Sequence, residues 1–336
     1  MFRPHMFSRR SFAALLLSSV PIAAIMAQPL ADPLPSWREG ATKRAILEFL
    51  RKTTSRDSSD YLPPSARIAV FDNDGTLWVE QPIYAEVVFA VDRVKALAPL
   101  HSDWASREVF QAALAGDMAS LVKGGLRAMG TIVLASHAET TPDTFHQLVS
   151  DWLITARHPR FHDRYTNCIY QPMVEVLTLF RAYGYRTWIV SGGTTEFLRP
   201  WTQGIFGVPP DQVIGTTLKT TYSMRDGRGE LVQLGELESL DEGAGKVVNL
   251  YRSLGQRPVA AFGNSDGDYE MLQFTTTGQG PRLGVLIHHD DGDREYAYDR
   301  DTNIGKLDRG LADAAANGWS VSSIKNDWSR VFADHQ

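Results

Sequence analysis

Two aspartates stand two positions apart, directly after a short apolar run. Asp72 and Asp74 follow residues 67–71, and Gly75 and Thr76 come next. Residues two apart on an extended strand end point the same way, so the two carboxylates would repel each other. A hard dication such as Mg²⁺ between them would stabilise the pair, because such ions prefer oxygen ligands. With that cation in place, one carboxylate could attack as a nucleophile while the other moves protons.

The residues around this pair suit an anion as well as an acidic turn. Gly75 lets the backbone turn tightly, and Thr76 offers a hydroxyl and an amide to a phosphate. The run Asp-Asn-Asp-Gly at 72–75 is also ordinary turn chemistry. On its own it would favour an acidic turn after a strand, so the decision depends on polar groups elsewhere in the chain.

Two such groups suit a phosphate. Ser191 follows the apolar run 186–190 and has two glycines and two threonines behind it. A hydroxyl and exposed amides at a strand end that opens into a helix can bind a phosphate oxygen. Lys246 stands near the start of a helical pattern at 243–254, where it would offset the charge of a phosphoryl group. A P-loop around Lys246 is excluded, because Val247 stands where that motif needs Ser or Thr.

Oxygen-bearing side chains also gather after a third apolar run. Asn264, Asp266 and Asp268 follow residues 258–262. Carboxylate and amide oxygens are the ligands that Mg²⁺ takes in proteins. This group and the Asp72–Asp74 pair could therefore share one metal, if the fold brings the two runs together.

The elements that would bring these groups together can be traced from the apolar runs. Helical patterns lie between runs rich in branched residues, which we expect to be buried strands. The four runs are residues 67–71, 186–190, 258–262 and 283–287. Strands that alternate with helices predict an α/β fold with a doubly wound parallel sheet. In such sheets ligands bind beyond the carboxyl ends of the strands, where three of these runs carry their polar groups.

Two segments do not fit a simple alternation. More than a hundred residues separate the first run from the second, which exceeds what one crossover helix needs. Residues 84–126 and 142–158 have mostly helical spacing, so we expect residues 81–164 to form an inserted helical cap. Residues 216–234 alternate and contain an Asp-Gly pair, which predicts a hairpin with a tight turn.

The N-terminus has the pattern of an export signal. Arg9 and Arg10 precede Phe12, and no charged residue occurs from Phe12 to Ala27. A positive segment, an apolar stretch and small residues near a cut after Ala27 are typical of a signal peptide. The paired arginines resemble a twin-arginine signal, so we expect a periplasmic or secreted protein. The alternative is a membrane anchor, but this stretch is short for a span and no later segment is long and apolar enough.

These patterns divide the chain of 336 residues into four parts. We expect a signal peptide at 1–27, a tether with one helix at 28–65, a catalytic core at 66–80 plus 165–336, and the cap at 81–164. The formal net charge of −5 gives no sign of the basic surface that nucleic acid would require. We therefore expect no nucleic-acid partner, and no stable membrane span once the signal is removed.

Taken in order, the polar groups resemble the motifs of the haloacid dehalogenase-like hydrolases. The matching residues are Phe71-Asp72-Asn73-Asp74-Gly75-Thr76-Leu77, Val190-Ser191-Gly192-Gly193, Lys246 and Gly263-Asn264-Ser265-Asp266-Gly267-Asp268. The resemblance spans residues 66–80 and 165–290. The helical insert and the hairpin resemble the phosphoserine-phosphatase-like branch. The resemblance implies a Rossmann-like core and a Mg²⁺-dependent phosphomonoesterase that acts on a small phosphorylated substrate.

The resemblance also implies roles for individual residues. Asp72 would be the nucleophile that forms an aspartyl-phosphate, and Asp74 would be the acid/base. Lys246 would assist catalysis. The phosphate would be bound by Thr76, Ser191, Gly192 and Lys246. Mg²⁺ would be held by the Asp72 side chain, the Asp74 backbone carbonyl, and Asn264 or Asp268.

One position departs from the family pattern. The family usually has Asp directly after the glycine of the last motif, and Asn264 stands there in this chain. An amide oxygen can ligate Mg²⁺, but it brings no charge. Asp268 matches the usual second acid of the motif, and Asp266 lies between the two. The ligand at this motif therefore stays open among the three.

Other functions are compatible with parts of the pattern. A carbon–halogen hydrolase of the same superfamily would lack the second aspartate, so Asp74 argues against that chemistry. A phosphotransferase would share the core, because the choice of acceptor lies in the cap. A non-catalytic exported binding protein on a degenerate hydrolase frame is supported by Asn264 and opposed by Asp72, Ser191 and Lys246.

Three further features have ordinary structural interpretations. Adjacent histidines on a strand point to opposite faces, so we expect residues 288–291 to be a polar strand end and surface loop. Cys168 is the single cysteine, and we expect it to be a packed small residue. Trp78, Glu80 and Gln81 face either the substrate or the hinge of the cap.

Overall fold

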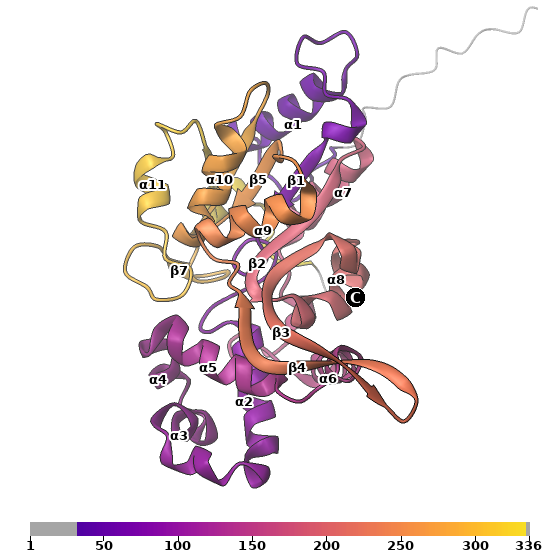
Figure 1. The fold of residues 1–336 in the computed structure, drawn as a ribbon. Helices are drawn as coiled ribbons and strands as arrows, with labels where there is room; N and C mark the ends of the chain where they lie inside the picture. Colours follow the sequence, from indigo (N-terminus) through magenta and orange to yellow (C-terminus); the bar gives the residue numbers. More distant parts are fainter. Residues whose placement is uncertain (1–31, 334–336) are drawn as a thin grey trace, which may run out of the picture. The chain divides into compact units, whose positions relative to one another are not determined.

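A mixed β-sheet lies at the centre of the computed structural model, which describes residues 32–333 (Figure 1). Eight strands among these residues form it: β1 Ile68–Phe71, β2 Arg186–Thr194, β3 Val213–Arg225, β4 Arg228–Ser239, β5 Ala260–Gly263, β6 Leu283–Asp290, β7 Ala297–Tyr298 and β8 Ser320–Ser323. The order is β4-β3-β2-β1-β5-β6-β7, and β8 also pairs with β6. Within the sheet β3, β2, β1, β5, β6 and β8 are parallel, whereas β4 and β7 are antiparallel to their neighbours.

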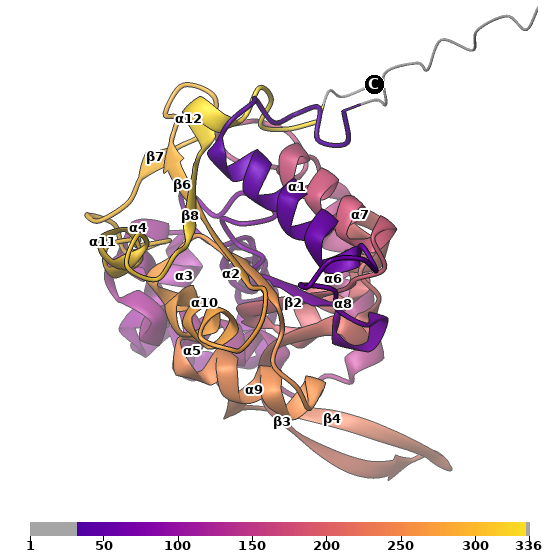
Figure 2. The ribbon, with the colours of Figure 1, turned by 90° about the horizontal axis from the view of Figure 1, so that it is seen from above.

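Helices cover both faces of this sheet. They are α1 Ala41–Thr54, α2 Ala85–Leu97, α3 Glu108–Ala115, α4 Met118–Lys123, α5 Gly125–His137, α6 Pro142–Thr155, α7 Gln171–Ala182, α8 Thr195–Phe206, α9 Ala244–Leu254, α10 Tyr269–Thr276, α11 Arg309–Asp313 and α12 Ile324–Asp327. Viewed from above, α1, α7 and α8 lie on one side of the strands and α9 and α10 on the other (Figure 2).

The side chains of the central strand β1 show why helices cover both faces of the sheet. Successive side chains of a strand point to opposite faces. Ala69 and Phe71 join the core beneath α1, α7 and α8, whereas Ile68 and Val70 join the core beneath α9 and α10. All four residues are fully buried. A run that is apolar on both faces is the expected signature of a strand in a doubly covered parallel sheet.

Helices α2–α6 occupy the long segment between β1 and β2, and they lie below the sheet in Figure 1. These helices pack in two directions. Phe89 and Phe145 join the core that includes Phe197 of α8, whereas Val91 and Ile132 belong to a separate cluster within the helical segment. The segment therefore has an apolar core of its own and a second apolar face toward the sheet domain.

The strands β3 and β4 form a long hairpin that projects beside α6 (Figure 1). Asp226 and Gly227 at its turn both have positive φ, 51° and 78°. A two-residue turn with two left-handed residues matches the right-handed twist of the strands. The backbone of Gln233 in β4 makes two hydrogen bonds with the turn between α5 and α6. Its carbonyl accepts from Glu139 N at 2.9 Å, and its amide donates to Thr140 O at 2.9 Å.

The predicted fold class is confirmed, because the four apolar runs are parallel neighbours in one sheet with helices on both faces. The predicted hairpin is also present. Helix α5 and the edge strand β8 were not among the predicted elements. The boundaries proposed for the core and the cap stay predictions, and the export signal lies outside the described residues. Within residues 32–333 no helix is both long and apolar enough to cross a membrane.

Candidate active site

The order of the strands brings the sequence motifs to one edge of the sheet. Strand β1 lies between β2 and β5, with Phe71 opposite Ile189 on one side and Phe262 on the other. The ladder continues one residue further, because Asp72 N donates to Phe262 O at 2.9 Å. The loops after these strands therefore begin side by side, although Asp72 lies more than a hundred residues from Ser191 and from Asn264 in the sequence.

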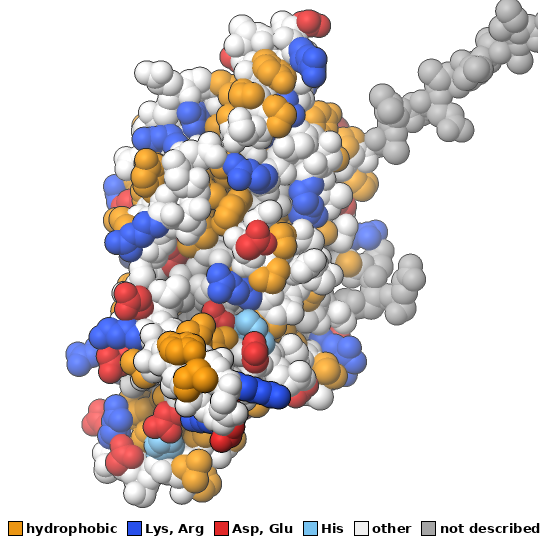
Figure 3. All heavy atoms as spheres, turned by 45° about the vertical axis from the view of Figure 1, so that its right-hand side comes forward, with side chains coloured by type: hydrophobic (Ala, Val, Ile, Leu, Met, Phe, Trp, Pro, Cys, Tyr) orange, Lys and Arg blue, Asp and Glu red, His pale blue; other side chains and the backbone are white. Residues whose placement is uncertain are grey.

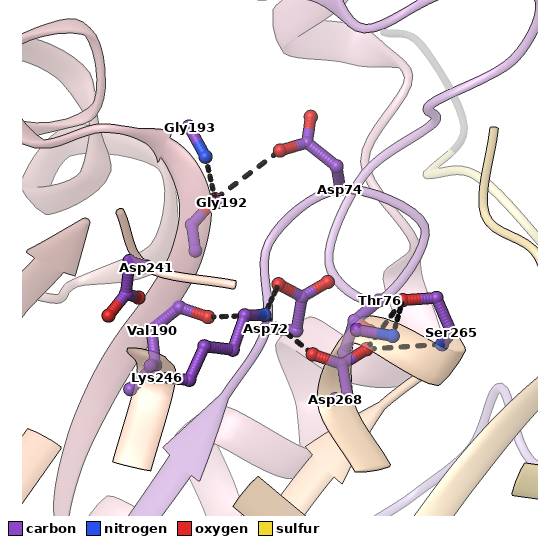
Figure 4. Close-up of polar contacts among 12 residues, drawn as sticks. Asp72, Asp74, Thr76, Val190, Gly192, Gly193, Asp241, Lys246, Ser265 and Asp268 are labelled. Carbon is purple, nitrogen blue, oxygen red and sulfur yellow. Dashed lines mark hydrogen bonds and ion pairs between the residues drawn. The ribbon is translucent and has the colours of Figure 1, made fainter. Parts of the chain in front are cut away.

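Lys246 connects two of these loops (Figure 4). Its Nζ donates to Asp72 Oδ1 at 2.6 Å, to Asp268 Oδ1 at 2.5 Å and to the carbonyl of Val190 at 3.1 Å. Burial raises the pKa of Asp72 and the charge of Asp268 adds to this, whereas the Lys246 ammonium opposes it. Burial alone would lower the pKa of Lys246, but the charges of Asp268 and Asp72 raise it well above its usual value. Lys246 is therefore a buried cation held between two carboxylates.

Asp74 is held apart from this ion pair. Trp78 Nε1 donates to Asp74 Oδ1 at 2.8 Å, and Ser191 Oγ donates to Asp74 Oδ2 at 3.4 Å. Ser191 Oγ in turn accepts from Gly193 N at 3.1 Å. Burial raises the pKa of Asp74, and the hydrogen bond from Trp78 lowers it. The two aspartates thus differ in environment, since only Asp72 contacts a cation.

Asn264 is fixed by partners at both ends of its amide. Thr76 Oγ1 donates to Asn264 Oδ1 at 3.1 Å, and Asn264 Nδ2 donates to Glu80 Oε1 at 2.6 Å. Glu80 Oε1 also accepts from the Tyr298 hydroxyl at 2.7 Å. Glu80 is only 2% exposed, and burial raises its pKa well above the usual range. Glu80 therefore turns the carbonyl end of Asn264 toward Thr76 in the catalytic loop.

Three predicted site residues have hydrogen bonds that the sequence did not indicate. Asp268 accepts from Lys246 on one oxygen and from the amides of Asn264 and Ser265 on the other. Asp266 accepts from the backbone amides of residues 308–310. Thr76 is fully buried, and its hydroxyl donates to Asn264 and its amide to the carbonyl of residue 73. The metal and phosphate roles expected of these three residues stay predictions.

The histidine pair also differs from the expectation of a surface loop. His289 is 2% exposed, and its ring nitrogens lie 2.7 Å from the carbonyl of Gly75 and 2.9 Å from Glu295 Oε2. Gly75 has φ +74°, and a Cβ there would lie 2.0 Å from Asn264 Nδ2. His289, on β6, therefore supports the turn after β1 from two strands away. Only glycine fits at position 75 of this turn. The expected polar strand end is present, since β6 continues to residue 290 and His288 is only partly buried, but His289 points into the protein.

A cavity of about 480 Å³ opens above these loops. Of the predicted residues, Asp72, Asp74, Gly192 and Lys246 line it. Its walls also include Glu80, for which the sequence left the substrate and the cap hinge open, and two acids that the sequence patterns did not single out, Glu86 and Glu242. Glu242 and the buried Asp241 directly precede Gly243 at the start of the Lys246 motif, so their position in the sequence could have indicated them. Glu86 carries no such signal, because it lies within an ordinary helical pattern.

Glu86 joins the helical segment to the loop after β2. Its Oε2 accepts from Thr194 N at 2.9 Å, and its Oε1 accepts from the Thr194 hydroxyl. The Thr194 hydroxyl also lies 3.0 Å from His137 Nε2, and it caps α8 by accepting from Phe197 N. Burial raises the pKa of Glu86 to about 7 and lowers the pKa of His137 to about 4. This link connects α2, α5 and α8.

The donors at the strand ends fit a Mg²⁺ ion. Within residues 32–333, no three side chains of His, Cys, Asp or Glu are grouped as a metal cluster. The expected ligands are the Asp72 carboxylate, the backbone carbonyl of Asp74 and the Asn264 amide, which would not count as such a cluster. All three supply hard oxygen ligands. Among the described residues, the hydrogen bonds of Asp72 use only Oδ1, so its Oδ2 has no protein donor. Asp72, Asp74 and Glu80 all have raised pKa values through burial, which a nearby dication would offset.

Comparison with known proteins gives one family match. Residues 69–273 match the family described as haloacid dehalogenase-like hydrolase. No curated protein sequence matches the chain.

Several solved structures resemble parts of the chain at low identity. A protein of unknown function from Anaerococcus prevotii is 16% identical, with a TM-score of 0.49, covering 74% of this chain and 86% of that one. One from Bordetella pertussis is 19% identical, with a TM-score of 0.46 and coverage of 76% and 97%. A phosphoserine phosphohydrolase-like protein from Francisella tularensis is 14% identical, with a TM-score of 0.37 and coverage of 74% and 98%. Likeness at this level carries no inference about activity.

Proposed function

Because the chain belongs to the haloacid dehalogenase-like hydrolase family, we propose that it is a Mg²⁺-dependent phosphohydrolase of phosphate monoesters. The observation that carries the proposal is the contrast between the two aspartates. Asp72 is paired with Lys246 at 2.6 Å, whereas Asp74 has only neutral donors, from Trp78 and Ser191. Asp72 is thereby suited to remain an anion and attack, and Asp74 is suited to carry a proton.

The reaction divides into two steps on these side chains. In the first, an oxygen of Asp72 attacks phosphorus, the bond to the ester oxygen breaks, and Asp74 gives its proton to the leaving oxygen. In the second, Asp74 takes a proton from water as the water oxygen attacks the aspartyl-phosphate. Asp72 is released as a carboxylate, and inorganic phosphate is the product.

The phosphoryl group would be bound by Ser191, Gly192 and Lys246 at the base of the cavity. Ser191 and Gly192 lie in the last part of β2, and Lys246 lies in the first turn of α9, so the strand and the helix bring their donors to the same edge of the sheet. Asp72, the Asp74 carbonyl and Asn264 would hold Mg²⁺. When bound, that ion would neutralise charge on the phosphoryl oxygens and reduce the repulsion among the buried carboxylates.

Hydrolysis of a panel of phosphate monoesters, with and without Mg²⁺, tests this function. We expect turnover that requires Mg²⁺ and is lost on chelation. Asp72→Asn should abolish turnover because the nucleophile is gone, and Asp74→Asn should slow it by about 10²–10⁴-fold. Asp211→Asn, the same change at an exposed position, is the matched control. Wild-type activity in Asp72→Asn on any ester would contradict the proposed mechanism.

A further inference from the structure

The cavity has a second region beyond its phosphate end. On one side it is lined by α5, through Met129, Val133 and Leu134. Helix α5 contributes no acid to the lining, and its one charged residue there, Arg127, is exposed. The region that would receive the leaving group of a substrate is therefore walled mainly by hydrocarbon.

The mouth of the cavity has three leucines that are exposed to solvent. Leu126 of α5 is 60% exposed, Leu237 of β4 is 44% exposed and Leu240 just after β4 is 49% exposed. These residues come from two elements that are far apart in the sequence. Exposed apolar side chains that converge on one cavity gain stability when a ligand covers them. The face shown in Figure 3 has groups of apolar side chains among interspersed positive and negative ones.

The charges beside this region disfavour a second anion. Glu80, Glu86 and Glu242 line the cavity. The buried cation Lys246 is already shared by Asp72 and Asp268. A leaving group with a carboxylate or another phosphate would therefore meet acidic side chains, and among the described residues the only lining cation besides Lys246 is Arg127, which is exposed.

We propose that the leaving group of the substrate is apolar and carries no second anion, so that the enzyme acts on alkyl-type phosphate monoesters rather than on sugar phosphates or bisphosphates. This inference rests on the proposed phosphohydrolase function. The phosphate lies at Asp72 and Lys246, and the hydrocarbon chain lies between α5 and the end of β4. Residues Met129, Leu134 and Leu237 determine the specificity.

A series of n-alkyl phosphates from ethyl to octyl measures this preference. Each methylene that is buried should raise kcat/KM by up to about fourfold, until the cavity is filled. An ω-carboxyalkyl phosphate of the same length should be a poorer substrate by at least about tenfold. Equal rates along the series, or faster hydrolysis of glucose 6-phosphate than of hexyl phosphate, would overturn the proposal.

Two matched variants of one strand locate the effect. Leu237 and Leu231 both lie on β4 and are similarly exposed, at 44% and 51%, but only Leu237 lines the cavity. Leu237→Ser should flatten the dependence on chain length, and Leu231→Ser should leave it unchanged. The same loss of dependence in both variants would contradict the assignment, because a general effect on the hairpin would then explain it.

Binding of alkylphosphonates separates this inference from the proposed function. These compounds cannot be hydrolysed, and calorimetry reports their affinity without turnover. Tighter binding with chain length, together with no hydrolysis of any ester, would refute the phosphohydrolase function and keep the apolar site. Hydrolysis of esters with phosphonate binding that is independent of chain length would refute only the apolar site.

Discussion

Lys246 contacts Asp72 and Asp268, and none of these three side chains is more than 5% exposed. Replacing the lysine by glutamine would leave two buried carboxylates without a cation. Breaking a buried ion pair in this way costs about 3–5 kcal/mol. We therefore expect Lys246→Gln to lower the free energy of unfolding by several kcal/mol and to abolish turnover. Urea unfolding at pH 7 measures the first effect, and an unchanged midpoint would contradict the assigned ion pair.

Asn264 and Glu80 form a hydrogen-bonded pair, in which Glu80 has the carboxyl group and Asn264 has the amide. Asn264→Asp alone would place a second carboxylate against Glu80, where the donor and acceptor now lie 2.6 Å apart. We expect this variant to lose about 1–3 kcal/mol of stability, because a buried hydrogen bond is replaced by repulsion. The double variant Glu80→Gln/Asn264→Asp exchanges the two chemical groups and keeps one donor facing one acceptor. It should recover the lost stability.

Mg²⁺ binding, measured by calorimetry, gives the second readout for this exchange. In the double variant the charge moves from Glu80 to the proposed metal ligand, so Mg²⁺ should bind at least as tightly as in the wild type. Glu80→Ala should weaken Mg²⁺ binding, since it frees the Asn264 amide to rotate. If Glu80→Ala and the wild type bound Mg²⁺ equally, Glu80 would have no part in positioning Asn264. Activity is not needed for either measurement.

At the scale of elements, the link from Glu86 to Thr194 and His137 ties α2 and α5 to the start of α8. Glu86 and His137 are both buried. The charge of Asp74 also raises the pKa of Glu86, and the charge of Glu196 opposes the lowering of the pKa of His137. Glu86 has a folded pKa of about 7, above its ordinary value of 4.5, so its contribution to stability is complete below pH 4.5 and is lost as pH rises through 7. His137 has a folded pKa of about 4, below 6.5, so its contribution is lost as pH falls from 6.5 through 4.

The pH ranges in which Glu86 and His137 affect stability lead to a prediction for Glu86→Gln. The change removes a contribution to the free energy of unfolding, on the order of 3 kcal/mol, that the wild type loses between pH 4.5 and 7. Between pH 5 and 8, the wild type should therefore lose more stability with rising pH than the variant does. Thermal unfolding of both proteins across this range checks it, with Glu139→Gln as the control in the nearby turn. Parallel curves for Glu86→Gln and the wild type would contradict the raised pKa.

Elements that carry their own signal could be predicted from the sequence. The buried strands β1, β2, β5 and β6 each contain a short apolar run, and the turn of the hairpin contains the Asp226-Gly227 pair that its geometry requires. Strand β8 could not be recognised, because Ser320–Ser323 has no apolar residue except Val321 and obtains its partners only from β6. Helix α5 was missed because residues 125–137 begin with Gly125 and contain Gly130, which both disfavour a helix.

The site was predictable to the extent that its residues end a strand or begin a helix. Asp72, Ser191 and Lys246 do so, and parallel strands then bring them together. Side-chain partners across the fold could not be predicted, as with Glu80 on Asn264 or His289 on the carbonyl of Gly75. The ion pair of Asp268 with Lys246 could not be predicted either, because Lys246 comes from a different helix.

At the scale of the whole molecule, the chain combines a fold without disulfides and an export pattern at its N-terminus. Cys168 is the single cysteine and is buried, so the described fold needs no oxidising compartment. A chain of this kind can complete its fold in the cytoplasm. The twin-arginine route, which the Arg9-Arg10 pattern resembles, carries proteins that are already folded. We therefore propose that the protein folds first and is then exported to the periplasm or beyond.

Export by this route leads to the last prediction, which concerns residues outside the described structure. The mature chain should begin near Gln28, after the apolar stretch that ends at Ala27. Arg9→Lys/Arg10→Lys should retain the protein in the cytoplasm as a folded and active precursor, because neither residue belongs to the described fold. Arg51→Lys, an equivalent change on the exposed face of α1, should leave export unchanged. N-terminal sequencing and fractionation of cells decide the matter. Continued export of the double variant would refute the twin-arginine route, and a mature chain that still begins at Met1 would refute the cleaved signal.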